Sequence, residues 1–570
     1  MSSIAPLPVV VPLAGAAVVL FSHSFAPRAL IRALSAAAVA AEIALATVLL
    51  HQVRSSTIVY WFGGWTPRAG VALGISFTVD QIGAAAAVLA GVVVAAALTI
   101  IPTLGDGDGI VHALLLTLLA AMAGFCLTGD LFNLFVFFEL MAVSAFALAA
   151  YHTRSMAAMR GALNFAIANS IGAFLFLVGI ALLYGRTGAL NLAQIGRYLA
   201  THGGLDRLVI VALALIVVGL LVKAAVAPFH FWLVDTATSA PIPLVVVLAG
   251  VLDTLGVYGV ARVYWTAFAV PMAGDHTLRA VLVAIGAVTA GGAAVLSLSF
   301  QEPRRRLAFV MVAHTGIILI GVGCLTAHGV AASAMYAAGD GTVKAVLWIG
   351  LALLGWRASS DIPRRAGAAF LVIGGLALAG LPVFATGLGK AAIEDAAARV
   401  GAGWVTPVIV IAAALTGAAA IRVATVGSAG TAETSGGWRV PVVAGVALLA
   451  VSAAVIAAGD WVAAAASRFV ATVAYQQQVL TGRATPSPTS SLHLGLPATG
   501  LALGLIAVAG AVVLGSGVLA PAARRLAGAE PVATMWRAAR RLHDGSIGDG
   551  ATWTTIGTAA IALALASGLR

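Results

Sequence analysis

Long apolar runs recur along the whole chain, separated by short breaks that carry Arg, Gly or Pro. A helix needs about 20 predominantly apolar residues to cross a bilayer, whereas a membrane β-barrel would alternate apolar and polar residues. The pattern therefore predicts an all-α polytopic membrane protein with about 14–16 transmembrane helices. The expected spans are residues 8–21, 28–50, 77–101, 110–128, 131–152, 160–184, 207–227, 240–263, 277–299, 306–326, 329–355, 366–388, 403–425, 440–458, 497–520 and 552–569.

Three of these runs contain an interruption close to a lysine. Pro228 follows Lys223, a Gly-Asp-Gly sequence precedes Lys344, and a Gly-Leu-Pro sequence precedes Lys390. Non-helical backbone at membrane depth is tolerated only where it is buried in protein or lines a cavity. Matched interruptions in two halves of a transporter mark its ion site. The chain is therefore expected to contain inverted repeats with broken helices near Lys223 and Lys390.

The chain is expected to divide into three parts. Residues 1–75 form N-terminal transmembrane helices, residues 76–425 form the core, and residues 426–570 form C-terminal transmembrane helices. Two polar stretches interrupt the last part. Residues 459–496 are interpreted as an exposed loop that begins with an interfacial helix, and residues 521–551 as a basic loop facing the cytoplasm.

Composition supports a membrane protein and excludes other classes. Mean hydropathy is +1.07, with 61% hydrophobic and 9% charged residues, which rules out an ordinary soluble domain. The net charge of +11 comes from scattered residues and predicts no nucleic-acid partner. An N-terminus on the outside puts 17 of the 28 arginines on the inside, a modest bias that supports this orientation under the positive-inside rule. No soluble segment is large enough for a cofactor, and Cys126 and Cys324 are expected as buried residues without a disulfide or metal.

Lysine is the residue type that first indicates chemistry. Of 31 basic residues only three are Lys, and Lys223, Lys344 and Lys390 all lie in predominantly apolar segments. Arg does not deprotonate in proteins, whereas a buried Lys can release its proton. Coding bias towards Arg would explain why Lys is rare but not where it remains. The distribution therefore predicts proton relay, although Lys390, nearer a helix end, could also snorkel.

Acidic residues in apolar runs extend this candidate set. An ionised group at a helix centre costs about 2.5–3.5 kcal/mol on insertion scales, so Glu139 is expected to have a partner, with Lys223 the first candidate. Asp253 also lies in an apolar run, and Asp340 would share a helix face with Lys344 if the turn between them is regular.

Histidines and two further aspartates have competing interpretations. His230 and His314 titrate near neutral pH and could extend a relay, but each could equally be a hydrogen-bonded core residue. Asp80 and Asp235 lie at expected helix ends, where capping is the favoured role.

These residues occur in motifs that resemble a known family. Residues 128–139 (TGDLFNLFVFFE) are similar to the helix-five signature of the proton-conducting antiporter-like subunits found in Mrp-type cation/proton antiporters, complex I and related hydrogenases. Residues 223–233 (KAAVAPFHFWL) resemble the broken helix seven, and residues 304–316 resemble the basic loop and the histidine stretch after it. Residues 380–390 keep the spacing of the helix-twelve lysine motif, and residues 542–549 (LHDGSIGD) resemble the ending of longer members.

The resemblance, which covers about residues 75–420, implies roles for individual residues. Glu139 and Lys223 would be the charged pair that modulates proton uptake. Lys344 would belong to a central relay with His314, and Lys390 would be the exit-side lysine. By this resemblance, residues 76–425 form an antiporter-like proton-translocation core.

Departures from the family pattern lie in the centre. Thr254, preceded by Asp253, stands where the family usually has a helix-eight lysine, and Asp340 stands where a histidine is common. Val234 replaces the usual proline of Trp-Leu-Pro after helix seven. Asp253 is the candidate substitute for the missing lysine.

Three functions remain open at this stage. The preferred one is a D-like subunit of a multi-subunit monovalent cation/proton antiporter in the cell membrane of a prokaryote, with other membrane subunits as partners and H⁺, together with Na⁺ or K⁺, as the transported ions. The second is the proton-pumping membrane subunit of a complex I-like or hydrogenase-like enzyme, with no redox chemistry on this chain. The third is a non-conducting structural subunit, a hypothesis motivated by Thr254 and Asp340.

Overall fold

The computed structural model describes residues 2–54, 56–104, 108–151, 156–202, 204–356, 358, 360–426, 437–483, 492–516 and 547–568. Within these ranges most residues are helical, and the single sheet is an antiparallel pair, β1 (Ile58–Trp61) and β2 (Ser76–Val79). The helices are α1 Leu7–Ser22, α2 Arg28–Gln52, α3 Gln81–Leu98, α4 Asp108–Leu127, α5 Leu131–Ala149, α6 Met156–Thr187, α7 Leu192–Thr201, α8 Arg207–Lys223, α9 Phe231–Ser239, α10 Ile242–Val247, α11 Asp253–Val263, α12 Thr277–Ser299, α13 Pro303–Gly323, α14 Ala327–Leu354, α15 Ile362–Ala379, α16 Ala385–Arg399, α17 Thr406–Val426, α18 Arg439–Ala454, α19 Gly459–Phe469, α20 Thr472–Thr481, α21 Ala498–Gly515 and α24 Ile547–Gly568.

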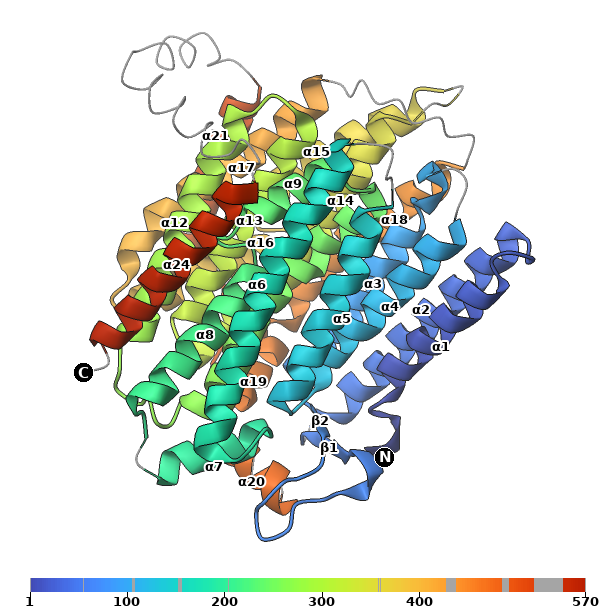
Figure 1. The fold of residues 1–570 in the computed structure, drawn as a ribbon. Helices are drawn as coiled ribbons and strands as arrows, with labels where there is room; N and C mark the ends of the chain where they lie inside the picture. Colours follow the sequence, from blue (N-terminus) through green and yellow to red (C-terminus); the bar gives the residue numbers. More distant parts are fainter. Residues whose placement is uncertain are drawn as a thin grey trace.

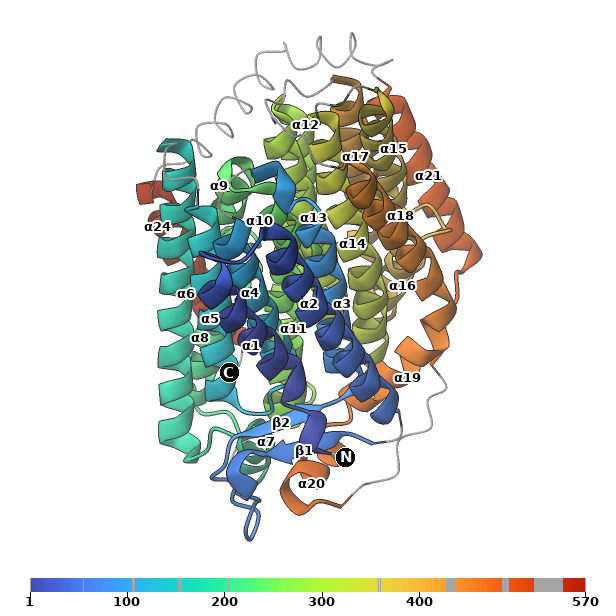
Figure 2. The ribbon, with the colours of Figure 1, turned by 90° about the vertical axis from the view of Figure 1, so that its right-hand side faces the viewer.

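The long helices stand side by side in one bundle (Figures 1 and 2). In the described part of the chain, 13 helices are long and apolar enough to cross a membrane, and two shorter apolar helices accompany them. The prediction of a polytopic all-α membrane protein is therefore confirmed. We call the end that carries β1, β2, α7 and α20 the hairpin end. The opposite end, at which α2, α13, α15 and α18 begin, is the arginine-rich end.

Two expected boundaries differ from the structure. The span predicted at 77–101 begins later, because β2 occupies its first residues and Asp80 caps α3 by accepting a hydrogen bond from the backbone of Gly83. The polar stretch predicted at 459–496 is not all loop. Its first part, α19, continues the span that begins at α18, because its small side chains pack against α14 and α3. Residues 484–491 and most of the predicted loop at 521–551 lie outside the described residues.

The two expected broken helices are present, and they run in opposite directions. Helices α8 and α9 rise towards the arginine-rich end, whereas α15 and α16 descend towards the hairpin end (Figure 1). This antiparallel arrangement agrees with inverted repeats. The third predicted interruption is wrong, because α14 is continuous. Its glycines serve packing instead: a Cβ on Gly341 would collide with the carbonyl oxygen of Gly250, and one on Gly339 with the backbone of Thr386.

Helix α24 packs across the outside of the bundle. It contacts α8, α12 and α6 and is the red helix that crosses Figure 1 obliquely. Gly557 lies directly against Pro228 and Phe229, where any larger side chain would collide. The rings of Trp553 and Phe231 stack with their centroids 6.3 Å apart. Helix α24 thus covers the break between α8 and α9.

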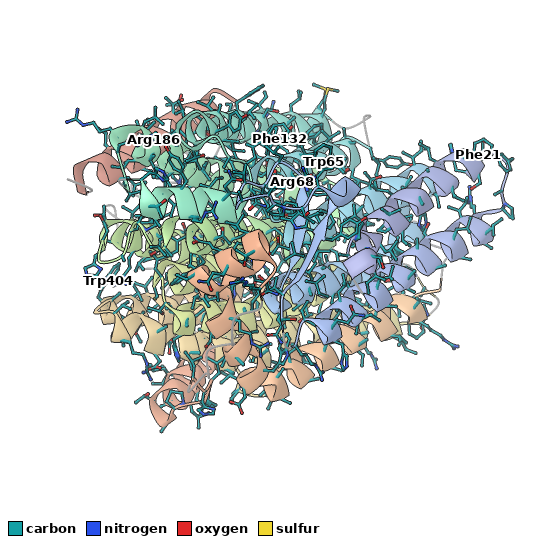
Figure 3. The ribbon with its side chains drawn as sticks, turned by 90° about the horizontal axis from the view of Figure 1, so that it is seen from below. Phe21, Trp65, Arg68, Phe132, Arg186 and Trp404 are labelled. Atoms are coloured by element: carbon teal, nitrogen blue, oxygen red, sulfur yellow. The ribbon has the colours of Figure 1, made fainter. Side chains whose placement is uncertain are left out.

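The bundle is asymmetric at its edge. Helices α1 and α2 project from one side, as the view from below shows, with the exposed Phe21 at the tip of the pair (Figure 3). Trp65, in the loop between β1 and β2, is also exposed at the hairpin end. The interior is one large apolar cluster that includes residues from nearly every long helix. Most of the ionisable groups described below are buried inside it.

Candidate functional site

Helix α5 positions Glu139 halfway across the bundle. The carboxylate of Asp130 caps this helix by accepting a hydrogen bond from the backbone of Asn133 at 2.9 Å, which fixes where the helix begins. Glu139 lies just over two turns further along and is half-buried. No hydrogen-bond partner of its Oε1 is found in the described part of the chain.

Lys223, the last residue of α8, is completely buried. Its Nζ donates a long hydrogen bond of 3.4 Å to the carbonyl oxygen of Phe138 and lies 4.7 Å from the centre of the Phe138 ring. Lys223 and Glu139 interact electrostatically. Among the described residues, however, no direct ion pair joins them. The predicted Glu–Lys pair is therefore a neighbouring pair without a salt bridge.

The break after Lys223 is built from proline and compensating donors. Pro228 has no N–H and cannot continue the hydrogen-bond ladder of α8. The indole nitrogen of Trp232 donates to the carbonyl oxygen of Val222 at 2.9 Å, and the backbone N–H of Ala227 donates to the hydroxyl of Thr289 at 3.0 Å. These bonds satisfy polar groups that the broken helix leaves free.

His230 lies beside this break, and its ring stacks on Phe231 with centroids 4.4 Å apart. It also lies 6.3 Å from the ring of Phe309 on α13. The aromatic surroundings fit both interpretations of this histidine, as a packed core residue and as a relay member.

Lys344 forms the centre of the buried polar network. Its Nζ lies 2.8 Å from Oδ2 of Asp253 and 2.8 Å from Oδ2 of Asp340, and all three residues are buried. Because α14 is regular, Asp340 and Lys344 share one face at i and i+4. Thr315 of α13 donates a further hydrogen bond of 3.1 Å to Asp253. One ammonium thus bridges two carboxylates from different helices.

His314 continues the network from Asp340. Its Nδ1 lies 2.9 Å from Oδ1 of Asp340 and 2.7 Å from the hydroxyl of Tyr336, and its Nε2 lies 2.9 Å from the hydroxyl of Thr416. The ring is completely buried. Sequence reasoning did not identify Tyr336 or Thr416, because neutral hydroxyl residues in apolar helices give no distinctive signal.

Lys390 on α16 has a partner that the sequence analysis missed. Its Nζ donates to Oε1 of Glu394 at 2.8 Å, one turn further along the same helix, and both side chains are buried. The next carboxylate, Asp395, is partly exposed and pairs with His328 at 3.1 Å and with Arg399 at 2.8 Å. An i,i+4 spacing of Lys and Glu is the signal that could have revealed the first pair.

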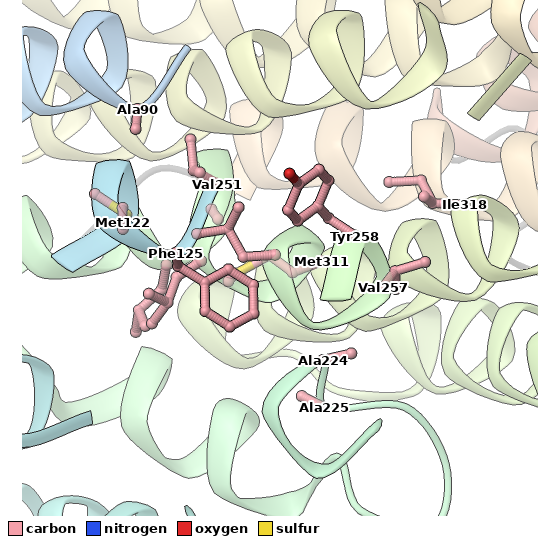
Figure 4. Close-up of a cluster of buried hydrophobic side chains, with 14 of the residues drawn as sticks. Ala90, Met122, Phe125, Ala224, Ala225, Val251, Val257, Tyr258, Met311 and Ile318 are labelled. Carbon is pink, nitrogen blue, oxygen red and sulfur yellow. The ribbon is translucent and has the colours of Figure 1, made fainter. Parts of the chain in front are cut away.

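Glycines bring these groups onto neighbouring helices. Gly256, one turn after Asp253, packs against the backbone of Leu220 and Ala224 at the end of α8. The close-up in Figure 4 shows Ala224 and Ala225 beside α11, with an apolar cluster around Tyr258. On the other side, Gly389 packs against the backbone of Tyr336. The structure thus packs α11 against the end of α8 and α16 against α14, so that the predicted residues lie on neighbouring helices.

One of the two predicted capping residues is a helix cap and the other is not. Asp80 caps α3 as expected, but it also pairs with the buried Arg262, whose guanidinium donates to Tyr258 as well. Asp235 is not a cap. It lies inside the short helix α9, where its carboxylate accepts a hydrogen bond of 2.8 Å from Asn164 of α6.

Thr254, which stands where a lysine was expected, faces an apolar cavity and does not contact Lys344. The cavity has a volume of about 300 Å³ and lies between α3, α11, α14, α18 and α19. The hydroxyl of Thr254 donates a hydrogen bond of 3.2 Å to the carboxylate of Asp253. Asp253, and not Thr254, is therefore the residue of α11 that contacts Lys344.

Comparisons with known proteins identify relatives of this chain. Residues 128–416 match the family described as NADH:quinone oxidoreductase/Mrp antiporter, TM. NADH-quinone oxidoreductase subunit N of Desulforudis audaxviator is 31% identical over 324 residues, covering 55% of this chain and 62% of that protein. The D subunit of the Na(+)/H(+) antiporter of Bacillus subtilis is 26% identical over 355 residues, covering 61% of this chain and 69% of that protein.

The fold itself has a solved counterpart. A chain in the structure of the Mrp complex from Dietzia sp. DQ12-45-1b superposes with a TM-score of 0.74 and 24% identity, covering 84% of this chain and 99% of that one. The alignment with subunit N, in contrast, spans about three fifths of that protein's length. The family match includes both broken helices and the buried network. The chain therefore belongs to the NADH:quinone oxidoreductase/Mrp antiporter transmembrane family.

Proposed function

We propose that this chain is a proton-conducting subunit of a multi-subunit monovalent cation/proton antiporter in the cell membrane of a prokaryote. The observation that supports it most strongly is the buried network centred on Lys344, which holds one ammonium between two carboxylates inside a membrane bundle. Charged groups at this depth are costly and mark ion or proton pathways. The relay members are Glu139, Lys223, His230, Asp253, Lys344, Asp340, His314 and Lys390.

Proton transfer along this line follows from the chemistry of its members. A proton that arrives at Glu139 neutralises the carboxylate that favours the charged form of Lys223. Lys223 then releases its proton towards the centre of the line. There Lys344 exchanges protons between its two carboxylate partners, and His314 accepts on one ring nitrogen and donates from the other.

From Lys390 the line leads along α16 towards the hairpin end of the bundle. Glu394 lies one turn beyond that lysine, and the partly exposed Asp395 follows. Exposure increases along α16 from the buried lysine to the helix end, where Arg399 reaches solvent. This gradient supports an exit-side role for Lys390.

The test uses vesicles that contain the complete complex and measures cation-dependent dissipation of a pH gradient. Glu139→Ala and Lys223→Ala should each lower the rate by about 100-fold, because a positioned proton-transfer group contributes about 10²–10⁴-fold. Glu302→Ala, at an exposed position, is the matched control. Unchanged activity in both site variants would sink the relay and favour a non-conducting structural subunit.

A second candidate function is the proton-pumping membrane subunit of a complex I-like or hydrogenase-like enzyme. The 31% identity to NADH-quinone oxidoreductase subunit N favours it. In this case the redox centres would lie on other chains. Purification of the complex from its native membrane distinguishes the two functions: redox subunits would co-purify in one case, and only further membrane subunits in the other.

A further inference from the structure

Glu42 on α2 is a buried acid outside the region that matches the family. It lies 14 residues beyond the start of α2, about 21 Å from the arginine-rich end. Its exposed fraction is 0%, and no hydrogen-bond partner of either carboxyl oxygen exists in the described part of the chain. The proposed relay does not use this residue.

The described side chains of the neighbouring helices leave space for the carboxyl group, and none of them forms an ion pair with it. Gly91 of α3 faces it, and a Cβ at that position would collide with the carboxyl. Helix α2 packs against α1, α3 and α4. Neither α1 nor α3 contains a titratable residue, and on α4 the described titratable side chains are His112 and Cys126. The Cys126 thiol interacts electrostatically with Glu42.

An unpaired carboxylate would be unfavourable in this position. Insertion scales assign an acidic residue about 2.5–3.5 kcal/mol at the centre of a span, and such groups are normally paired or neutralised. Binding a proton removes the charge without any partner. A Ca²⁺ or Mg²⁺ ion does not fit, because it takes about six or more oxygen ligands and the described surroundings supply a single carboxyl group.

A cavity lies between this position and the arginine-rich end. It has a volume of about 420 Å³ and lies between α2, α3, α4 and the beginning of α18. Val39 and Ile43, which flank Glu42 on α2, line it, and so does Ala95, one turn from Gly91 on α3. Its other end is polar, with Arg32, Thr99 and His112 in its wall. The cavity therefore ends about one helical turn from the carboxyl group.

We infer that Glu42 is a proton-binding site reached from the arginine-rich end through this cavity, separate from the line between Glu139 and Lys390. The ligand is a proton delivered by water. The site lies among the N-terminal helices and shares no residue with the proposed relay.

Infrared spectroscopy of the intact complex in vesicles tests this directly. The wild-type minus Glu42→Gln difference spectrum should contain the carbonyl band of a protonated carboxylic acid. The band should shift in D₂O and disappear when the pH is raised. Glu302→Gln, at an exposed site, is the control and should not remove this band. A difference spectrum without the band, or a band insensitive to D₂O and pH, would overturn the proposal.

The cavity is tested by filling it. Ala95→Leu should slow the deuterium exchange of the Glu42 carboxyl several-fold, because the larger side chain occupies the route for water. Ala44→Leu, on the exposed face of the same helix as Glu42, should not. Equal exchange rates in the two variants would contradict the proposed route.

Labelling of the wild-type complex with dicyclohexylcarbodiimide gives a measurement that needs no variant. This reagent reacts with protonated carboxyl groups in apolar surroundings, and peptide mass spectrometry locates the adduct. A Glu42 adduct that decreases as the pH rises supports the proton site. No adduct at Glu42, in a sample in which another buried carboxyl of the same chain is labelled, would refute it.

Discussion

Lys223 and Lys344 are both buried lysines near the middle of the bundle, yet their surroundings differ. Lys223 makes one long hydrogen bond to a backbone carbonyl and faces the ring of Phe138. Lys344 is held at 2.8 Å by each of two carboxylates, and one of them binds His314 as well. One ammonium is loosely placed, and the other is fixed on two sides.

This difference indicates a division of labour. A relay group that changes partner must lose little when it moves, and the long bond of Lys223 satisfies that condition. A fixed ammonium between two buried carboxylates instead compensates their charge. Removing one partner of a buried pair leaves an uncompensated charge and costs about 3–5 kcal/mol. Lys344 should therefore be as important for folding as for transport.

The largest effect is expected for Lys344→Met. Two buried carboxylates would lose their shared cation, and the complex should lose about 3–5 kcal/mol of stability and much of its yield. Lys223→Met, which breaks no ion pair, should assemble at nearly wild-type levels. Thermal unfolding and the yield of purified complex measure the contrast. Adding Asp340→Asn to Lys344→Met should restore part of the stability. Equal yields of Lys344→Met and Lys223→Met would contradict the distinction between the two lysines.

A smaller effect is expected when a lysine is placed at the position where the family usually has one. Thr254→Lys would put an ammonium into an apolar cavity and should cost about 2.5–3.5 kcal/mol. It should not rescue Asp253→Asn, because residue 254 does not face Lys344. Transport and melting temperature of the double variant check this. Recovery of transport would show that the lysine reaches the line after all.

The aromatic contact of Lys223 should contribute less. Phe138→Leu removes the ring but keeps the backbone carbonyl, so the loss is limited to a cation–π contact worth about 2 kcal/mol or less. We expect a several-fold change in transport rate with an unchanged yield. Phe146→Leu, on the same helix, is the control. A yield as low as that of Lys344→Met would mean that Lys223 is also a structural group.

The hydroxyl of Tyr336 tests the periphery of the fixed cluster. In Tyr336→Phe, His314 keeps Asp340 as a partner on the same nitrogen, so the loss should be about 0.5–1.5 kcal/mol. The measurement is a melting curve in detergent. A loss as large as that of Lys344→Met would show that the tyrosine, rather than the ammonium, holds the cluster together.

The smallest effect is expected at the other end of the helix that carries Lys223. Asp206 caps α8, and the Arg186 guanidinium 2.6 Å away holds the pKa of that carboxyl below its usual value. Its contribution to stability is present above the unfolded pKa of about 3.9 and is lost as the pH falls through the folded value. Asp206→Asn should weaken that acid dependence slightly. An unchanged acid unfolding profile would show that this exposed pair contributes nothing measurable.

The sequence was sufficient to predict the buried lysines and both broken helices, because ionisable residues and proline in apolar runs are locally visible. Partners were harder to predict. The pair of Arg262 and Asp80 joins residues 182 positions apart, and nothing local links them. The prediction of an interruption before Lys344 was wrong. A Gly-Asp-Gly sequence is typical of a helix break, but here the glycines allow close packing of neighbouring helices. Glu394 was missed because the polar residues after it resemble an ordinary helix end.

Helix α24 has a consequence for how the protein is made. Gly557, which lies against Pro228, is synthesised 329 residues after it. At about 5–20 residues per second, the break between α8 and α9 spends roughly 15–65 s in the membrane before its cover exists. During that time the apolar surface of Pro228 and Phe229 must be covered by lipid or by the insertion machinery. Closure of the bundle is therefore a late event in biogenesis, timed by the ribosome.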